Sequence, residues 1–173
     1  MSAIISEGEV ALRPVEESDL GLIMRWRNSP EVSAYLFSTA AYTMEGQRKW
    51  FARLRESGDI YAIAEYQGTP FGLGRIVNID AAHQKCEIGG EIGELSFRGK
   101  GLGKKLFYLL TKHCFRSLGM NRVYLKVFAS NAVAIHIYES LGYQHEGVLR
   151  QDVLKEGAYR DVLVMGVLRD EWK

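Results

Sequence analysis

Apolar residues recur along this chain with two spacings, at every second residue in some segments and at every third or fourth residue in others. The first spacing is typical of strands and the second of helices. Side chains that cap helices precede three of the apolar stripes, at Ser18 or Asp19, at Thr43, and at Ser130 or Asn131. The predicted helices cover residues 19–27, 45–55, 101–118 and 131–141. The predicted strands cover residues 9–13, 59–65, 71–79, 86–93, 122–128, 143–154 and 158–168.

The order of these elements is β-α-α-β-β-β-α-β-α-β-β, which predicts an α/β (α+β) fold with a mixed sheet and helices on both faces. The strand predicted over 86–93 is unusually rich in glycine, with Gly89, Gly90 and Gly93. Glycine inside a strand often marks a bulge or a close approach of another group to the backbone. The length of 173 residues, without a linker-like segment, predicts a single domain over residues 1–173.

Charge and composition narrow the function classes. Lys and Arg number 22 against 21 Asp and Glu, a net charge of +1, so we expect no nucleic-acid partner. The longest uncharged apolar run near the C-terminus, Val162–Leu168, is far shorter than the ~20 residues that span a bilayer. Met1–Glu7 lack a signal-peptide pattern, so we expect no membrane partner and a cytoplasmic location. The two cysteines, Cys86 and Cys114, indicate neither a disulfide scaffold nor a metal site.

The segment Phe97–Lys104 carries the clearest chemical signal, because it lies between a predicted strand and the longest predicted helix. It has glycine at three alternate positions, Gly99, Gly101 and Gly103. It also carries three basic side chains, Arg98, Lys100 and Lys104. Exposed N–H groups at a helix N-terminus favour an anion, and glycines leave those groups uncovered. The segment therefore predicts a pyrophosphate-binding loop; the alternative is a glycine-rich turn with solvated basic residues.

Two common phosphate-binding motifs do not match this segment. A P-loop needs a hydroxyl residue after its lysine, and Lys100 is followed by Gly101. The motif G-x-G-x-x-G needs a third glycine where this chain has Leu106. The pattern that fits is [RQ]-x-x-G-x-[GA], the acetyl-CoA loop of the GCN5-related N-acetyltransferases (GNAT), with Arg98, Gly101 and Gly103 at its fixed positions.

The chain resembles this family well beyond the loop. Residues 123–143 resemble the second signature, a strand that leads into an N-x-x-A-x-x-x-Y helix followed by G-[FY]. Residues 146–150 and 159–162 resemble the ribosomal-protein-acetyltransferase-like branch, and Leu12–Pro14 with Asp19–Leu20 match its opening. The resemblance covers nearly the whole chain and implies the GNAT fold, with acetyl-CoA as co-substrate and no metal.

The resemblance also implies where acetyl-CoA binds. The mostly antiparallel sheet of the family is split between its fourth and fifth strands, here around residues 91–93 and 127–129, and pantetheine lies in the split. A bulged strand over 88–93 would leave free N–H groups, and one near Ile92 would polarise the thioester carbonyl. The implied acetyl-CoA-binding residues are Ile92, Gly93, Arg98, Gly99, Lys100, Gly101, Leu102, Gly103, Lys104, Val127, Phe128, Asn131 and Ala134.

Tyr138 is the sharpest catalytic candidate. It shares a helical stripe with Asn131, and a phenol near the coenzyme sulfur could protonate the departing thiolate as general acid. The alternative is a core aromatic residue. The amine must be neutral when it attacks, so a carboxylate commonly takes its proton, directly or through water. Glu91 and Glu94 are the candidates for this base, and either could instead be an ordinary paired or solvated carboxylate.

Substrate choice in this fold lies in the N-terminal helices and their loops. Residues 25–38 resemble the corresponding region of N-acetyltransferases that act on nucleotide-linked amino sugars. The substrate-binding candidates are Arg25, Trp26, Asn28 and Tyr35, with Arg27 as an alternative to Arg25 for contact with a diphosphate. The alternative is a core tryptophan beside a solvated basic face.

Other partners stay open. A polyamine would need an acidic pocket, and the sequence shows no acidic cluster in the N-terminal helices. A protein N-terminus is another possible acceptor, since the C-terminal half resembles the ribosomal-protein branch. A non-catalytic acyl-CoA-binding sensor is the alternative of a different class. The expected partner is a small-molecule amine, and a homodimer is left open.

Overall fold

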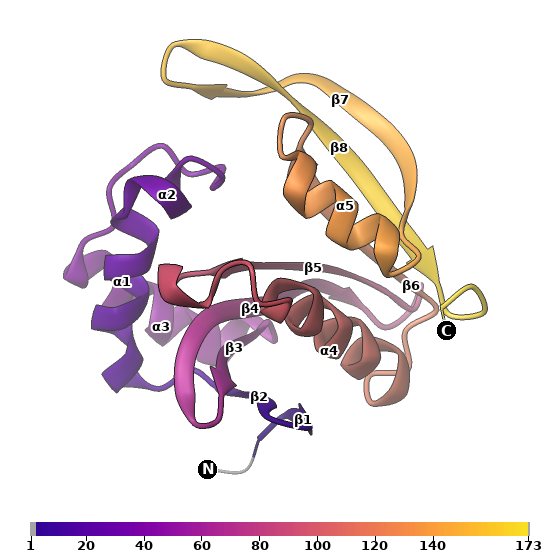
Figure 1. Cartoon of the computed structure of the whole chain (residues 1–173), viewed down its shortest axis with the longest axis horizontal. Coiled ribbons are helices and arrows are strands. Elements are labelled where there is room, and N and C mark those ends of the chain that lie inside the picture. Colours follow the sequence, from indigo (N-terminus) through magenta and orange to yellow (C-terminus); the bar gives the residue numbers. More distant parts are fainter. Residues whose placement is uncertain (1–2, 173) are drawn as a thin grey trace.

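The computed structural model describes residues 3–172 as an eight-stranded sheet with helices on both faces (Figure 1). Neighbouring strands follow the order β1-β2-β3-β4-β5-β6-β8-β7, and β5–β6 is the single parallel pair among them. The strands are β1 Ile5–Glu7, β2 Val10–Pro14, β3 Ile60–Tyr66, β4 Thr69–Asp80, β5 Lys85–Ile92, β6 Arg122–Phe128, β7 Gln144–Lys155 and β8 Ala158–Leu168. The α-helices are α1 Leu20–Asn28, α2 Pro30–Ser33, α3 Met44–Ser57, α4 Leu102–Arg116 and α5 Ala132–Ser140, with 3₁₀ turns η1 Glu17–Asp19 and η2 Leu95–Phe97.

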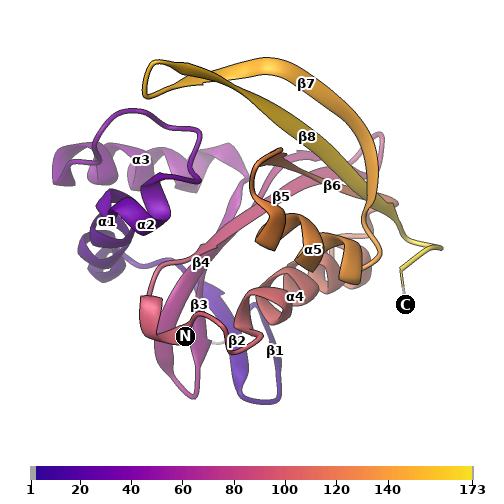
Figure 2. The same cartoon turned by 45° about the horizontal axis from the view of Figure 1, so that its top comes forward.

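The helices form two layers around the sheet (Figure 2). On one face, α4 and α5 cover the larger core, which includes Leu106, Leu110, Val123 and Tyr138. On the other face, α1 and α3 cover a smaller core. Its buried members are Val15, Ile23, Trp26, Ile63 and Leu73. This mostly antiparallel sheet between two helical layers confirms the predicted fold class.

Helix starts follow the predicted capping chemistry at two of the three positions. The Thr43 side chain accepts a hydrogen bond from the Gly46 N–H at 3.1 Å, and the Asn131 side chain accepts one from the Ala134 N–H at 3.2 Å. The prediction that Ser18 or Asp19 caps α1 is wrong, because no side chain caps that helix. Asp19 instead accepts hydrogen bonds from the Arg13 guanidinium, which hold the carboxylate against β2.

The sequence also missed one strand. Ile5–Glu7 forms β1, which pairs with β2 after a tight turn at Gly8. The Glu7 side chain accepts hydrogen bonds from Lys105 and Lys112 of α4, so this short edge strand is fixed to the helix beneath it. Among residues 3–172, no helix combines the length and the apolar composition that a membrane crossing would require.

Candidate active site

The sheet opens in its middle, between β5 and β6. These parallel strands pair only over their first residues, Lys85 to Glu87 in β5, and then diverge. Beyond that point β5 still pairs with β4 as far as Ile92, and β6 still pairs with β8 as far as Phe128. Each strand therefore keeps one partner and presents a free edge to the gap. Because the prediction did not include β1, β5 and β6 are its fourth and fifth strands, and the predicted split is confirmed.

The loop between η2 and α4 lies at the open end of the split. Within the described residues 3–172, none of the six backbone N–H groups of residues 99–104 has an acceptor, and the first bond of the helix is Lys105 N–H to Gly101 O at 3.1 Å. Six consecutive donors at the positive end of a 15-residue helix form a site for an anion.

Two glycines give this loop its shape. Gly99 and Gly101 have φ values of 74° and 75°, in the left-handed region where other residues are strained. A Cβ added at either glycine would meet no atom within 4 Å, so the space above the loop is not filled by the chain's own side chains. The predicted cradle is therefore open, and the chain's own residues fit a bound pyrophosphate.

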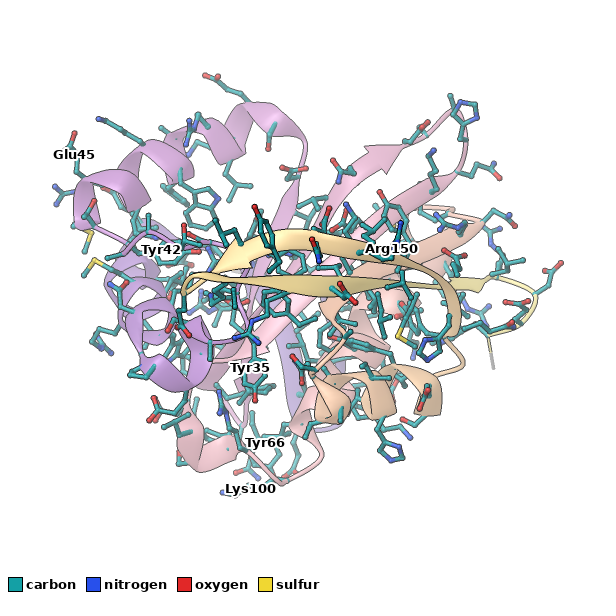
Figure 3. The ribbon with its side chains drawn as sticks, turned by 90° about the horizontal axis from the view of Figure 1, so that it is seen from above. Tyr35, Tyr42, Glu45, Tyr66, Lys100 and Arg150 are labelled. Atoms are coloured by element: carbon teal, nitrogen blue, oxygen red, sulfur yellow. The ribbon has the colours of Figure 1, made fainter. Side chains whose placement is uncertain are left out.

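The basic side chains of the loop differ in their surroundings. The Arg98 guanidinium turns away from the loop and donates to Glu31 O at 3.1 Å and to Ile92 O at 3.4 Å. Lys100 and Lys104 are exposed, and the Lys100 ammonium lies 5.2 Å from the centre of the Phe97 ring. Figure 3 shows Lys100 at the outer edge of the molecule. Arg98 thus ties the loop to β5 and α2, whereas the two lysines are free to approach an anion.

Strand β5 leads from the split to this loop. The N–H of Gly93 donates to Phe71 O of β4 at 3.0 Å. Because consecutive residues of a strand turn their N–H groups to opposite edges, the N–H of Ile92 points away from β4 and into the split. The Ile92 side chain lies on the α4 face, where a Cβ on Gly103 would be 3.8 Å from it. This orientation fits the role in binding the thioester carbonyl that the family resemblance implies for the N–H near Ile92.

The expected bulge lies at the end of this strand and not within it. Residues 87–92 keep regular antiparallel register with 72–77 of β4, whereas the N–H groups of Gly93 and Glu94 both donate to Phe71 O at 3.0 Å. A further irregularity lies near the turn, between Val77 and Asp80. The glycines instead make room for neighbouring side chains. A Cβ on Gly93 would be 2.1 Å from the Trp26 ring, and one on Gly89 would be 2.7 Å from Nε of Arg75. Within residues 88–92, the N–H groups that face the split lack a partner because β6 diverges from β5 after Glu87.

Tyr138 reaches the site from α5. Its ring is buried, edge-to-face with Phe107 at 4.7 Å between centroids. Burial raises the pKa of the Tyr138 phenol, and the positive charge of Arg75 opposes that shift only in part. Its hydroxyl has no hydrogen-bond partner among the described residues, so it keeps its proton and has a donor to offer. This arrangement fits a general acid, the role that the sequence suggested.

The remaining predicted cofactor residues lie at the end of β6, at the start of α5 and at the start of α4. Asn131 uses its side chain to cap α5, and Ala134 is the residue whose N–H it accepts. Val127 is buried in the larger core, and Phe128 packs edge-to-face on Phe37 at 4.8 Å. Val127 and Phe128 belong to the part of β6 that has diverged from β5, and Leu102 packs the first turn of α4 into the core.

Glu91 is held by a residue that the sequence did not favour. Its Oε1 accepts a hydrogen bond from Nε of Arg27 at 2.7 Å, and the two side chains are only 9% and 8% exposed. The Arg27 guanidinium also lies 5.4 Å from the Tyr42 ring and 5.9 Å from the Trp50 ring. Burial alone would lower the pKa of Arg27, but the Glu91 carboxylate outweighs burial and the pKa is raised.

Glu94 occupies a different place. It follows β5, its N–H donates to Phe71 O at 3.0 Å, and its half-buried side chain has no recorded partner among residues 3–172. Glu91 points toward α1, whereas Glu94 begins η2. The structure therefore separates the two candidate bases.

The four predicted substrate-binding residues do not converge. Arg25 is exposed, and Trp26 is buried in the smaller core against Gly93. Asn28 exchanges two 2.8 Å hydrogen bonds with the backbone of Tyr42, and Tyr35 is 53% exposed. Figure 3 shows Tyr42 among the N-terminal helices.

The tip of the β7–β8 hairpin closes one side of the site. Lys155 is buried, and its ammonium donates to the carbonyl oxygens of Ser33, Leu36 and Ser38 at 2.7, 2.6 and 3.3 Å. The hairpin thereby arches from the sheet to the loop after α2 (Figures 1 and 2). A cavity of about 390 Å³ lies beside this junction and is lined by Arg27, Asn28, Tyr42, Lys155 and neighbouring residues. No sequence signal pointed to Lys155, because its partners lie 117 to 122 residues away.

Comparison with known proteins places these features in context. The acetyltransferase (GNAT) domain family matches residues 9–144. The chain is 28% identical over 168 residues to spermidine N(1)-acetyltransferase of Escherichia coli (strain K12), covering 96% of this chain and 90% of that protein. It is 27% identical over 124 residues to the protein named "Putative ribosomal N-acetyltransferase YdaF" of Bacillus subtilis (strain 168), covering 72% of this chain and 67% of that protein.

Solved structures show the same fold. The crystal structure of spermidine N-acetyltransferase from Vibrio cholerae, in complex with CoA and spermine, has a TM-score of 0.89 to this chain at 24% sequence identity. The match covers 95% of this chain and 98% of that chain.

Proposed function

The chain belongs to the acetyltransferase (GNAT) domain family and is an acetyl-CoA-dependent N-acetyltransferase; from this premise we propose how it transfers the acetyl group and which amine accepts it. The family assignment and the activity confirm what the sequence predicted. The observation that carries the cofactor part of the proposal is the row of free N–H groups over residues 99–104, beside a split sheet.

Bound in the split, acetyl-CoA supplies an acetyl group on a thioester. The N–H groups of residues 99–104 bind the pyrophosphate, and the free edges of β5 and β6 orient the pantetheine arm. The Ile92 N–H donates to the acetyl carbonyl oxygen, where negative charge develops during transfer. Tyr138 donates its phenolic proton to the departing sulfur.

Glu91 accepts the proton of the attacking amine, directly or through water. Its Oε1 is engaged by Arg27, and its Oε2 has no recorded partner within residues 3–172. Arg27 holds the carboxylate in place and therefore acts as a positioning residue. The amine nitrogen forms the new bond to the acetyl carbon, the carbon–sulfur bond breaks, and the reaction yields an N-acetyl product and the free thiol.

The acceptor has two candidates, each favoured by a different observation. The relatives named above include spermidine N-acetyltransferases, which support the polyamine alternative and give no support to the amino-sugar acceptor expected from the sequence. The charges of this site favour a different amine. On the α1 face of β5, Glu91 is paired with Arg27, and Glu87 accepts a hydrogen bond from Asn78 at 3.0 Å. A polyamine is bound by carboxylates, and Arg27 already balances the charge of Glu91.

We therefore propose that the acceptor is a small amine that carries negative charge, such as a nucleotide-linked amino sugar, with spermidine as the second candidate. The test is release of free thiol from acetyl-CoA with four acceptors: a UDP-linked amino sugar, the same amino sugar without the nucleotide, spermidine, and an N-terminal peptide. Turnover of the UDP-linked sugar alone supports the first candidate. Preference for spermidine overturns it in favour of the second.

A glycine pair tests the cofactor site. Gly101 and Gly119 lie near opposite ends of α4, both are exposed, their φ values are 75° and 71°, and neither has an atom within 4 Å of an added Cβ. Gly101→Glu and Gly119→Glu therefore carry similar backbone strain, but only the first adds a carboxylate to the proposed anion site. Acetyl-CoA should raise the melting temperature of wild type and of Gly119→Glu, and not of Gly101→Glu. Equal shifts in all three proteins would remove residues 99–104 from the cofactor site.

A further inference from the structure

Arg75 is a charged residue at the split for which neither the sequence nor the proposed mechanism has a use. It lies in β4, opposite Gly89 of β5 and Tyr61 of β3. Its side chain is half-buried, yet no hydrogen bond or ion pair holds its guanidinium among residues 3–172. A guanidinium has five N–H donors, so a half-buried one without an acceptor is unusual.

The neighbouring carboxylates do not serve as its partners. Glu87 and Glu91 flank Gly89 on the same face of β5, two residues before and two residues after it. Glu91 is bound by Arg27 and Glu87 by Asn78. Two carboxylates attract a cation that lies between them, but the hydrogen bonds that they accept come from Arg27 and Asn78 and not from Arg75. The donors of Arg75 remain available to a ligand.

Gly89 gives this guanidinium its position. A Cβ on Gly89 would lie 2.7 Å from Nε, 2.9 Å from Cζ and 2.9 Å from Nη2 of Arg75. The guanidinium therefore lies against the backbone of β5, in space that any other residue would occupy. Gly89 comes two residues after Glu87, the last residue of β5 that pairs with β6, so the cation lies where the split begins.

The charge of Arg75 also reaches the reacting groups. It opposes the rise that burial causes in the pKa of the Tyr138 phenol, and it does the same at Tyr61. Arg75 lies opposite Gly89, on the face of β5 that also carries the proposed base Glu91. A ligand group bound by Arg75 would therefore lie on the same face of the sheet as that base.

We propose that Arg75 is a specificity residue of this enzyme, whose guanidinium binds a phosphate or carboxylate group carried by the acceptor amine. The inference rests on the proposed function, since it assigns a residue to the acceptor of that reaction. A guanidinium matches both anions with paired hydrogen bonds, whereas it repels the ammonium groups of a polyamine. Gly89 is part of the same site, because it provides the space for the guanidinium.

The test compares Arg75→Gln and Arg75→Lys with wild type and with Arg116→Gln, a control at an exposed arginine at the C-terminal end of α4. Acceptors are used in matched pairs: a UDP-linked amino sugar and the free amino sugar, and a carboxylate-bearing amine and its amide. Loss of hydrogen bonds to a charged group predicts a rise of about 10- to 100-fold in the KM of the anionic member for Arg75→Gln. The KM of the neutral member, the KM of acetyl-CoA and the activity of Arg116→Gln should stay unchanged. Arg75→Lys should recover part of the loss, because it keeps the charge.

The pair that responds identifies the anion as phosphate or carboxylate. Equal loss for both members of each pair, or no loss, overturns the assignment. A second arm measures binding of UDP to the CoA-bound protein by calorimetry, and of the carboxylate-bearing amine in the same way. If wild type acetylates none of these amines, the proposed acceptor class fails, and this arm alone decides the role of Arg75. Weaker binding to Arg75→Gln than to Arg116→Gln supports that role, and equal or absent binding overturns it.

Discussion

Removal of Arg27 should destabilise the protein far more than removal of an ordinary surface cation. The Arg27 and Glu91 side chains are 8% and 9% exposed, so Arg27→Met leaves a buried carboxylate without its partner. Breaking a buried ion pair at one side costs about 3–5 kcal/mol. At about 2–4 °C per kcal/mol for a chain of this size, the melting temperature should fall by roughly 6–20 °C.

The double variant Arg27→Met/Glu91→Leu separates lost pairing from lost packing. With both charges removed, no buried charge is left uncompensated, so the double variant should be more stable than Arg27→Met alone. The control is Lys49→Met, which breaks an exposed pair with Glu45 whose side chains are 70% and 77% exposed. That change should cost no more than about 0.5 kcal/mol.

The assay is thermal unfolding followed by circular dichroism, with denaturant unfolding as a second measure of stability. Arg27→Met and Lys49→Met with equal melting temperatures would refute the reasoning. So would a double variant whose loss equals the sum of the losses of Arg27→Met and Glu91→Leu, because the two side chains would then act independently.

Three further outcomes follow from the structure. Tyr138→Phe should keep the affinity for acetyl-CoA, measured by calorimetry, but lower kcat by roughly 10²–10⁴-fold. Since burial raises the pKa of Tyr138, the wild-type rate should not fall as the pH approaches the ordinary pKa of tyrosine. An unchanged kcat in the variant would make Tyr138 a packing residue. Lys155→Met removes three hydrogen bonds that fix the β7–β8 hairpin, so the KM of the acceptor should rise while the affinity for acetyl-CoA stays constant. A fall in the affinity for acetyl-CoA would show that the hairpin does not act on the acceptor alone. Hydrogen bonds from Lys105 and Lys112 lower the pKa of Glu7 from 4.5 to about 2. This depressed pKa stabilises the fold above pH 4.5 and the contribution is lost as pH falls toward 2, so the melting temperatures of wild type and Glu7→Gln should differ at neutral pH and converge at pH 2; a constant difference would argue against the linkage.

Local chemistry was the part of this site that the sequence predicted well. The positive φ values of Gly99 and Gly101 are a local property of glycine in a turn and need no contact with distant residues. The spacing of these glycines before an amphipathic helix therefore already indicated an anion site. The Asn131 cap and the position of Tyr138 on α5 are similarly local. The split sheet was predicted from family resemblance, because pairing between β5 and β6 depends on residues far apart in sequence.

The acceptor side was predicted poorly, for a physical reason. Arg25 and Arg27 differ by about 200° around a helix, and the sequence does not say which side of α1 faces the sheet. The structure turns Trp26 into the core and Arg27 toward Glu91, 64 residues away. No sequence pattern singles out Arg75, because its contact with Gly89 forms only when β4 and β5 pair.

Because β5 and β6 have unpaired edges, the stability of this protein should depend on the concentration of the ligand that binds between them. A sheet whose middle lacks main-chain partners is less stable alone than with a ligand that supplies them. Binding to the folded state adds RT ln(1 + [L]/Kd) to the free energy of unfolding, about 2.7 kcal/mol when the ligand is at 100 times its Kd. Cells rich in acetyl-CoA should therefore hold more of this protein folded and protected from proteolysis than starved cells, even before any amine is acetylated.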